Sequence, residues 1–146
     1  MEFRRLTASD LASLLDLYSQ LDENDRECSI DQSKEVWKEI EADDNIQYFG
    51  AIDDGKVVST CYAAYIPNLT RGNRGICFVE NVITDKEYRR CGLASRVIDM
   101  AIAFAKDRHC YKVILQSGMN RMEAHQLYES KGFNGGSKKA FDMRLD

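Results

Sequence analysis

Two runs rich in β-branched and aromatic residues, IQYFGAID at 46–53 and KVVSTCYAAYI at 56–66, constrain the fold more than any other part of the sequence. Such runs are typical of β-strands. The residues Asp53-Asp54-Gly55 separate them, and an Asp-Gly pair in that position is a strong signal for a tight turn. The sequence therefore predicts an antiparallel hairpin.

Apolar residues at helical spacing lie on both sides of this hairpin. We predict a strand at 2–6, a helix from about Thr7 to Leu21, a helix at 31–41, a strand at 75–84, a helix at 92–108, a strand at 111–118, a helix at 122–133 ended by Gly132, and a last strand within 137–146. This order predicts a mixed α/β domain with helices packed on a central sheet.

Composition limits the protein classes that fit. A chain of 146 residues, 44% apolar and 30% charged, fits a single domain over 1–146. The net charge of −4 argues against a nucleic-acid partner, and the absence of a long apolar run argues against a membrane span. Five cysteines without a C-x-x-C pair, together with only two histidines, favour a cytoplasmic protein without a metal site.

The stretch from Val79 to Met100 is the strongest candidate for a binding site. A strand leads through Arg89, Arg90 and Gly92 into a helix, whose first N–H groups have no partner within the helix. Such a helix end attracts phosphate. The alternative is a solvated basic face with Gly92 as a simple turn. The chain has neither a P-loop motif nor a G-x-G-x-x-G motif, so the usual nucleotide sites of those types are not supported.

Three motifs in order point to a family. Residues 89–94, RRCGLA, match an R/Q-x-x-G-x-G/A signature; ENVIT at 80–84 precedes it; and residues 124–133 match A-x-x-x-Y-x-x-x-G-F. With these motifs the chain resembles the GNAT superfamily of acyl-CoA-dependent N-acyltransferases. The resemblance implies a central, mostly antiparallel sheet of six to seven strands, splayed at the fourth and fifth strands and flanked by about four helices.

The resemblance also implies acetyl-CoA as co-substrate and a set of contacts to it. Backbone amides from about Arg90 to Ser95 would face the pyrophosphate as oriented N–H dipoles. A bulge in the strand at 75–84 would open a slot for the pantetheine arm. The family often has asparagine seven residues before the late tyrosine; here that position is Arg121, preceded by Asn120, and either could make the contact. The predicted cofactor-binding residues are Val82, Ile83, Arg89, Arg90, Cys91, Gly92, Leu93, Ala94, Ser95, Asn120 and Arg121.

Glu80 is the predicted base, or the residue that orients a water for that role. It lies in a strand that should be apolar throughout if both faces are covered, and a carboxylate there is costly unless it is partnered or used. Strict alternation places it on one face with Phe78 and Val82. A structural salt bridge or a solvent-exposed position is the alternative. Asn81 is a candidate substrate-binding residue.

Tyr128 is the predicted acid. In the resembling family, the tyrosine of this late helix stands near the thioester sulfur and can protonate the leaving thiolate. A half-buried packing tyrosine is the alternative. His125 lies three residues earlier on the same helix and could share its face.

We therefore expect an N-acetyltransferase that acts on a primary amine of a small molecule by direct attack in a ternary complex. A coenzyme-A-binding sensor without turnover and a protein or peptide N-acetyltransferase remain open, as does a homodimer. An acidic cluster at Asp22, Glu23, Asp25, Glu27 and Asp31 could attract a polyamine or an aminoglycoside, or could be a solvated loop. Short motifs resemble glucosamine-phosphate and aminoalkylphosphonate acetyltransferases without choosing between them.

Overall fold

The computed structural model describes residues 1–22 and 28–146. These residues divide into two compact units, Met1–Ile114 and Leu115–Asp146, and each is described by itself. The predicted α/β class is confirmed. In the described part of the chain the sheet has five strands in the order β1-β2-β3-β4-β5, rather than the six to seven expected.

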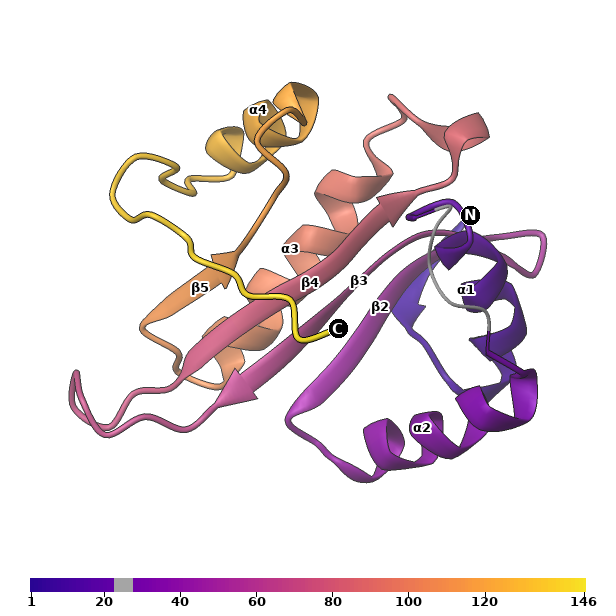
Figure 1. The fold of residues 1–146 in the computed structure, drawn as a ribbon, viewed down its shortest axis with the longest axis horizontal. Helices are drawn as coiled ribbons and strands as arrows, with labels where there is room; N and C mark the ends of the chain where they lie inside the picture. The colour runs from indigo at the N-terminus through magenta and orange to yellow at the C-terminus, as the bar shows by residue number, and fades with distance from the viewer. Residues whose placement is uncertain (23–27) are drawn as a thin grey trace. The chain divides into compact units, whose positions relative to one another are not determined.

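The sheet is built from consecutive neighbours (Figure 1). β1 (Glu2–Arg5), β2 (Ile46–Asp53), β3 (Lys56–Ile66) and β4 (Ile76–Thr84) each pair antiparallel with the next. β5 (Lys112–Leu115) follows β4 at the edge. The splay between the fourth and fifth strands stays a prediction.

The β2–β3 hairpin has the predicted turn. Asp53 pairs with Lys56, so the loop consists of Asp54 and Gly55. Both residues have positive φ, 46° and 76°, which is the backbone that a type I′ turn requires.

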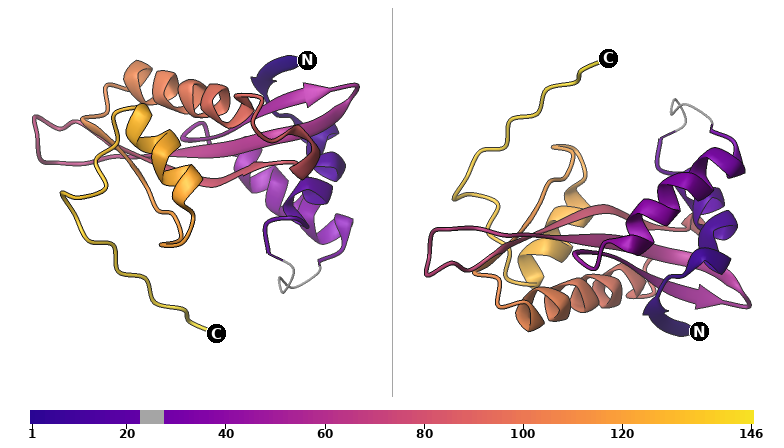
Figure 2. Two further views of the ribbon diagram at one scale, coloured as in Figure 1. Left: turned by 90° about the horizontal axis from the view of Figure 1, so that it is seen from above. Right: turned by 90° about the horizontal axis from the view of Figure 1, so that it is seen from below.

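Helices cover both faces of the sheet in the first unit (Figure 2). α1 (Leu11–Tyr18) and α2 (Ile30–Ala42) lie on one face, and α3 (Leu93–Asp107) lies on the other. The α1 and α2 side holds a core cluster of Leu6, Leu11, Leu14, Leu17, Trp37, Ile52, Val57 and Ile83. On the α3 side, the Cys61 thiol donates to the Val97 carbonyl at 3.3 Å.

The first helix is shorter than predicted. A 3-10 turn at Ala8–Asp10 precedes α1, because the Asp10 carboxylate accepts from the Thr7 N–H and forms an ion pair with Arg4 at 2.7 Å. α1 ends at Tyr18, and Leu21, which the periodicity included in the helix, is 40% exposed. No helix in residues 1–22 and 28–146 is long and apolar enough to cross a bilayer.

The second unit contains α4 (Met122–Ser130) and an extended C-terminal segment. α4 is closed as predicted at Gly132, which has φ 95°, and the Phe133 N–H donates to the Tyr128 carbonyl at 3.1 Å.

The last predicted strand, within 137–146, is wrong: these residues form no strand. Alternation marks a strand only where a neighbour covers one face, and here the large apolar side chains of the segment are exposed, with Phe141 at 83% and Leu145 at 93%.

Candidate active site

A β-bulge interrupts β4 next to Glu80. Tyr62 pairs with Glu80 and Thr60 pairs with Ile83, so two residues of β4, Asn81 and Val82, stand opposite one residue of β3. Asn81 has φ 52°, in the left-handed region. The bulge expected in this strand is therefore present.

The bulge changes which side chains share a face. Because Thr60 and Tyr62 are two residues apart on β3, their partners Ile83 and Glu80 lie on the same face. Ile83 accordingly joins the core cluster beneath α1 and α2. The expectation that Val82 shares the face of Glu80 is wrong, since strict alternation does not survive the extra residue. Phe78 keeps its predicted place through its pairing with Ala64.

Glu80 ends a row of aromatic side chains across the sheet. Tyr48 pairs with Tyr62, and Tyr62 pairs with Glu80. The rings of Tyr48 and Tyr62 stack at 4.8 Å, and Trp37 of α2 meets Tyr48 edge-on at 5.4 Å. Burial raises the pKa of Tyr62, and the negative charge of Glu80 adds to the rise. A half-buried carboxylate thus lies beside a phenol that stays neutral at physiological pH.

The structural salt bridge that the sequence left open for Glu80 is not found in residues 1–22 and 28–146. Asp10 and Asp85 show the contrast, because each is buried and ion-paired, at 2.7 Å and 2.9 Å. The Glu80 carboxylate is therefore not held by a cation of the described chain.

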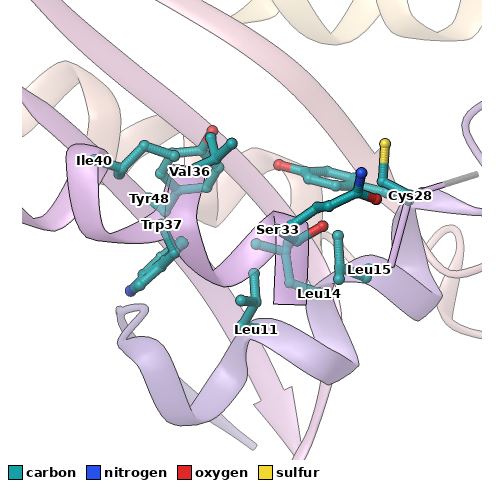
Figure 3. Close-up of a pocket in the computed structure, with 11 residues that line it drawn as sticks. Leu11, Leu14, Leu15, Cys28, Ser33, Val36, Trp37, Ile40 and Tyr48 are labelled. Atoms are coloured by element: carbon teal, nitrogen blue, oxygen red, sulfur yellow. The ribbon is translucent and has the colours of Figure 1, made fainter. Parts of the chain in front are cut away.

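A pocket of about 220 Å³ opens on the same face, between α1, α2 and β2 (Figure 3). Apolar and aromatic side chains make up most of its wall: Leu11, Leu14, Leu15, Tyr18, Val36, Trp37, Ile40 and Tyr48, joined by Cys28, Gln32 and Ser33. Figure 3 shows Val36, Ile40 and Tyr48 grouped in one part of the pocket wall. Because Tyr48 lines this pocket and stacks on Tyr62, the aromatic row connects the pocket wall to Glu80.

Tyr18 is a polar group that the sequence analysis did not single out. Its hydroxyl is buried and has no hydrogen-bond partner in the described part of the chain. Burial raises the pKa of Tyr18, and the nearby Asn81 side chain opposes this rise only in part. A buried phenol without a partner, on a pocket wall beside the bulge, is a candidate for hydrogen bonding to a bound molecule. A tyrosine within an amphipathic helix gives no sequence signal for this role.

The predicted anion-binding loop connects β4 to α3. Arg90 and Gly92 both have left-handed backbone, with φ of 62° and 75°. Gly92 is the N-cap of α3 and provides no side-chain cap, and the Arg96 N–H is bonded back to the Gly92 carbonyl at 3.3 Å. The N–H groups of Leu93, Ala94 and Ser95 therefore have no acceptor within the helix. A Cβ built on Gly92 would meet no atom within 4 Å, so the space beside Gly92 at the start of the helix is open.

The arginines of the loop differ from one another. Arg89 and Arg90 are exposed beside the helix end. The guanidinium of Arg96 instead lies 3.5 Å from the centre of the Phe3 ring of β1, in a cation–π contact. Cys91 is exposed, and its thiol donates weakly to the Arg89 carbonyl at 3.5 Å.

The buried carboxylate of Asp85, which the sequence did not indicate, fixes the start of this loop through its hydrogen bonds. Asp85 is 2% exposed and is bound by Lys56 at 2.9 Å, by the Glu87 N–H at 3.0 Å and by Gln20 at 3.3 Å. The Lys56 ammonium, more than the other contacts, holds the pKa of Asp85 below its usual range. The Tyr88 hydroxyl adds a bond to Asp53 at 3.0 Å. The turn before the anion-binding loop is thereby fixed to the β2–β3 hairpin.

The second unit holds the remaining predicted residues. Tyr128 is buried, and its ring meets Phe133 edge-on at 6.1 Å. His125 is bonded through Nε2 to the Gly118 carbonyl at 2.8 Å. Asn120 and Arg121 are exposed in the turn before α4. The proposed acid role of Tyr128 stays a prediction.

Other candidate chemistry finds little support. In the described ranges, no group of three or more histidine, cysteine, aspartate or glutamate side chains could hold a metal ion. Burial raises the pKa of the Cys61 and Cys77 thiols to about 12, so both stay protonated. Of the acidic cluster, Asp22 and Asp31 are exposed, and Glu23, Asp25 and Glu27 lie outside the described residues.

The sequence of this chain is similar to those of known acetyltransferases. The acetyltransferase (GNAT) family model matches residues 11–133. Glucosamine 6-phosphate N-acetyltransferase of Trypanosoma brucei brucei is 30% identical over 146 residues, which is 100% of this chain and 95% of that protein.

Solved structures agree. A protein of Agrobacterium tumefaciens str. C58 described as an acetyltransferase superposes with a TM-score of 0.93 at 34% identity, covering 99% of this chain and 100% of that one. The glucosamine-6-phosphate N-acetyltransferase of Arabidopsis thaliana shares the fold, with a TM-score of 0.88 at 23% identity, covering 99% and 98%. The chain belongs to the GNAT family of acetyltransferases.

Proposed function

We propose that this protein transfers the acetyl group of acetyl-CoA to a primary amine of a small molecule, by direct attack within a ternary complex. The main support is one arrangement on β4: the bulge at Asn81 lies between the Glu80 carboxylate and the open, uncapped start of α3. A single strand thus leads from an acid–base group to an anion-binding helix end.

The donor would be held by its phosphates and its pantetheine arm. The amides from about Arg90 to Ser95 suit a pyrophosphate, because successive N–H dipoles and the helix end carry partial positive charge. The open space over Gly92 leaves room for the ligand to approach. Arg89 would add long-range attraction. Val82 and Ile83 would offer main-chain groups where the bulge loosens pairing with β3.

Glu80 would accept the proton of the acceptor's ammonium group. A primary ammonium has a pKa near 10, so freeing its lone pair at neutral pH costs about 4 kcal/mol. A carboxylate without a protein cation beside it can accept that proton, directly or through water. Asn81, in the bulge, would orient the acceptor. In the second unit, Tyr128 would return a proton to the coenzyme A thiolate as it leaves.

The acceptor is proposed from two observations. The relative from Trypanosoma brucei brucei acts on glucosamine 6-phosphate, so phosphorylated amines come first. The pocket that Tyr48 lines, at the far end of the aromatic row from Glu80, is mostly apolar, which favours an amine with an apolar body instead. Both classes belong in one assay.

The decisive experiment measures thiol release from acetyl-CoA with a panel of amines. The panel holds glucosamine 6-phosphate, an aminoalkylphosphonate, an aminoglycoside, a polyamine, an arylalkylamine and a peptide with a free N-terminus. Turnover with any small amine, lost on Glu80→Gln, supports the proposal. Tight acetyl-CoA binding without turnover on any amine would favour the sensor, and turnover restricted to the peptide would favour a peptide acetyltransferase.

A further inference from the structure

The pocket between α1, α2 and β2 has the size and the wall for an uncharged ring (Figure 3). Its volume is about 220 Å³, and a dry apolar cavity of about 150 Å³ is enough to hold benzene. Among the residues that the structure describes, no lysine, arginine, aspartate or glutamate lines it. A phosphate placed there would leave water without a cation to pair with it, which is costly.

Tyrosines connect this pocket to the bulge in β4. Tyr18 and Tyr48 both line the pocket, and the Tyr48 ring stacks on that of Tyr62. Tyr62 in turn pairs with Glu80. Burial raises the pKa of Tyr18 and the nearby Tyr48 phenol adds to the rise, whereas the Asn81 side chain opposes it. Tyr18 therefore lies between the pocket and the bulge. Since β2 and β4 are two strand spacings apart, about 10 Å separates Tyr48 from Glu80.

The Glu80 end of this path suits a cation. Within residues 1–22 and 28–146, no lysine or arginine forms a salt bridge with Glu80. The phenol ring of Tyr62 is its cross-strand neighbour, and the face of an aromatic ring attracts an ammonium group. A primary ammonium here meets a carboxylate and aromatic faces, whereas a phosphate would be repelled by the same carboxylate.

We infer that the acetyl acceptor is an arylalkylamine, with its ammonium at Glu80, a short carbon chain beside Tyr18 and Tyr62, and its uncharged ring in the pocket between α1, α2 and β2. This inference rests on the proposed acetyl transfer and specifies the class of amine that receives the acetyl group. The same features make an amino-sugar phosphate a poor match, because the pocket wall provides no cation for its phosphate.

Thiol release from acetyl-CoA, measured with a matched series of amines, tests this acceptor class. The series holds phenylalkylamines with one to four carbons between ring and nitrogen, the same alkylamines without the ring, and glucosamine 6-phosphate. Burial of one ring should make kcat/KM of the best phenylalkylamine roughly 10- to 100-fold higher than that of its ring-free counterpart. It should exceed that of glucosamine 6-phosphate by at least about 100-fold.

Val36→Trp tests where the ring binds. Val36 lines the pocket and is 55% exposed, so a larger side chain there narrows the pocket without overpacking the core. For the phenylalkylamine, kcat/KM should fall at least about tenfold, mainly through KM, while the ring-free amine changes less than about twofold. Glu39→Trp, on the exposed surface of the same helix and outside the pocket, is the matched control and should change neither value.

Three results would overturn the inference and leave acetyl transfer in place: a preference for glucosamine 6-phosphate, equal kcat/KM with and without the ring, or an equal effect of Val36→Trp on both kinds of amine. If no amine is acetylated, calorimetry in the presence of coenzyme A decides. Phenylalkylamine binding that weakens in Val36→Trp would support the pocket and contradict acetyl transfer, and an absence of binding would contradict the inference itself.

Discussion

The candidate site has two parts: the proposed acetyl-CoA side, formed by the loop before α3, and the proposed amine side, formed around Glu80. The first is made mainly of backbone groups and the second mainly of side chains. The loop from Arg89 to Ser95 presents main-chain N–H groups, set by two left-handed residues and an uncapped helix. The other side gathers side chains from four elements: Trp37 on α2, Tyr48 on β2, Tyr62 on β3 and Glu80 on β4. A site made from backbone needs few particular residues, and a site made from side chains needs each of them.

This difference explains why the donor is easier to infer than the acceptor. Main-chain geometry is encoded locally, so a six-residue signature predicts it. The aromatic row depends on strand register, which joins residues as distant as Trp37 and Glu80. The comparison predicts that single substitutions in the loop act mainly on acetyl-CoA binding, whereas substitutions around Glu80 act mainly on turnover.

Gly92→Val provides the strongest test of the donor side. A β-branched side chain is strained at φ 75° and occupies the open space beside Gly92 at the start of α3. We expect acetyl-CoA affinity to fall about 100-fold or more, measured by calorimetry. Gly72→Val is the control, because Gly72 has φ 72° with nothing within 4 Å and lies outside the loop. Equal losses in both variants would assign the effect to strain alone.

Glu80→Gln tests the acceptor side. Loss of the carboxylate should lower kcat about 100-fold and change its pH dependence, with acetyl-CoA affinity within about threefold of wild type. Glu39→Gln, on the exposed surface of α2, serves as control. An unchanged pH profile would remove Glu80 as the base.

Tyr128→Phe tests the proposed acid. It keeps the ring that packs on Phe133 and removes the hydroxyl, so kcat should fall at least about tenfold while acetyl-CoA binding stays near wild type. Tyr111→Phe removes a phenol elsewhere and should change neither quantity. A parallel loss of binding and turnover would make Tyr128 a binding residue.

Asp85→Asn tests whether the donor loop is held by its buried brace. Breaking contacts of a buried carboxylate should lower the free energy of unfolding by about 1–3 kcal/mol at pH 7, measured by urea denaturation. Because the folded state depresses the pKa of Asp85, this contribution is present above the usual carboxyl pKa and is lost as pH falls through the folded value.

The difference between wild type and Asp85→Asn should therefore shrink below about pH 4. Asp31→Asn, at an exposed position in α2, should show no such gap. A gap that persists at low pH would exclude the charge of Asp85 as its origin.

Arg89→Gln should have the mildest effect. An exposed charge near a phosphate contributes little in water, so acetyl-CoA affinity should fall about two- to fivefold, and less at high salt. Lys106→Gln, at the other end of α3, removes the same charge about 20 Å away and should leave affinity unchanged. A loss above about 30-fold would mean that side chains, rather than backbone, dominate the donor side.

Local signals predicted most of the fold. The turn at Asp54-Gly55, the left-handed Gly92 and the helix end at Gly132 each depend on neighbours in sequence, and all three were confirmed. The last strand failed because alternation at 137–146 cannot report whether a partner strand exists. Val82 was predicted on the wrong face because no residue type in FVENVI indicates a bulge. Tyr18 and Asp85 were missed because their contacts come from segments distant in sequence.

The extra residue at Asn81 also affects how β4 is aligned with the strands of related sequences and what a deletion in it would do. The bulge reverses the alternation of β4. Before Asn81, the even-numbered residues Phe78 and Glu80 face α1 and α2; after it, the odd-numbered Ile83 does. An alignment that omits this one-residue gap would exchange Val82 with Ile83. Deleting Asn81 would leave Glu80 and Ile83 two residues apart, so regular alternation would still place Ile83 opposite Thr60 and the variant would lose the bulge while keeping its core face.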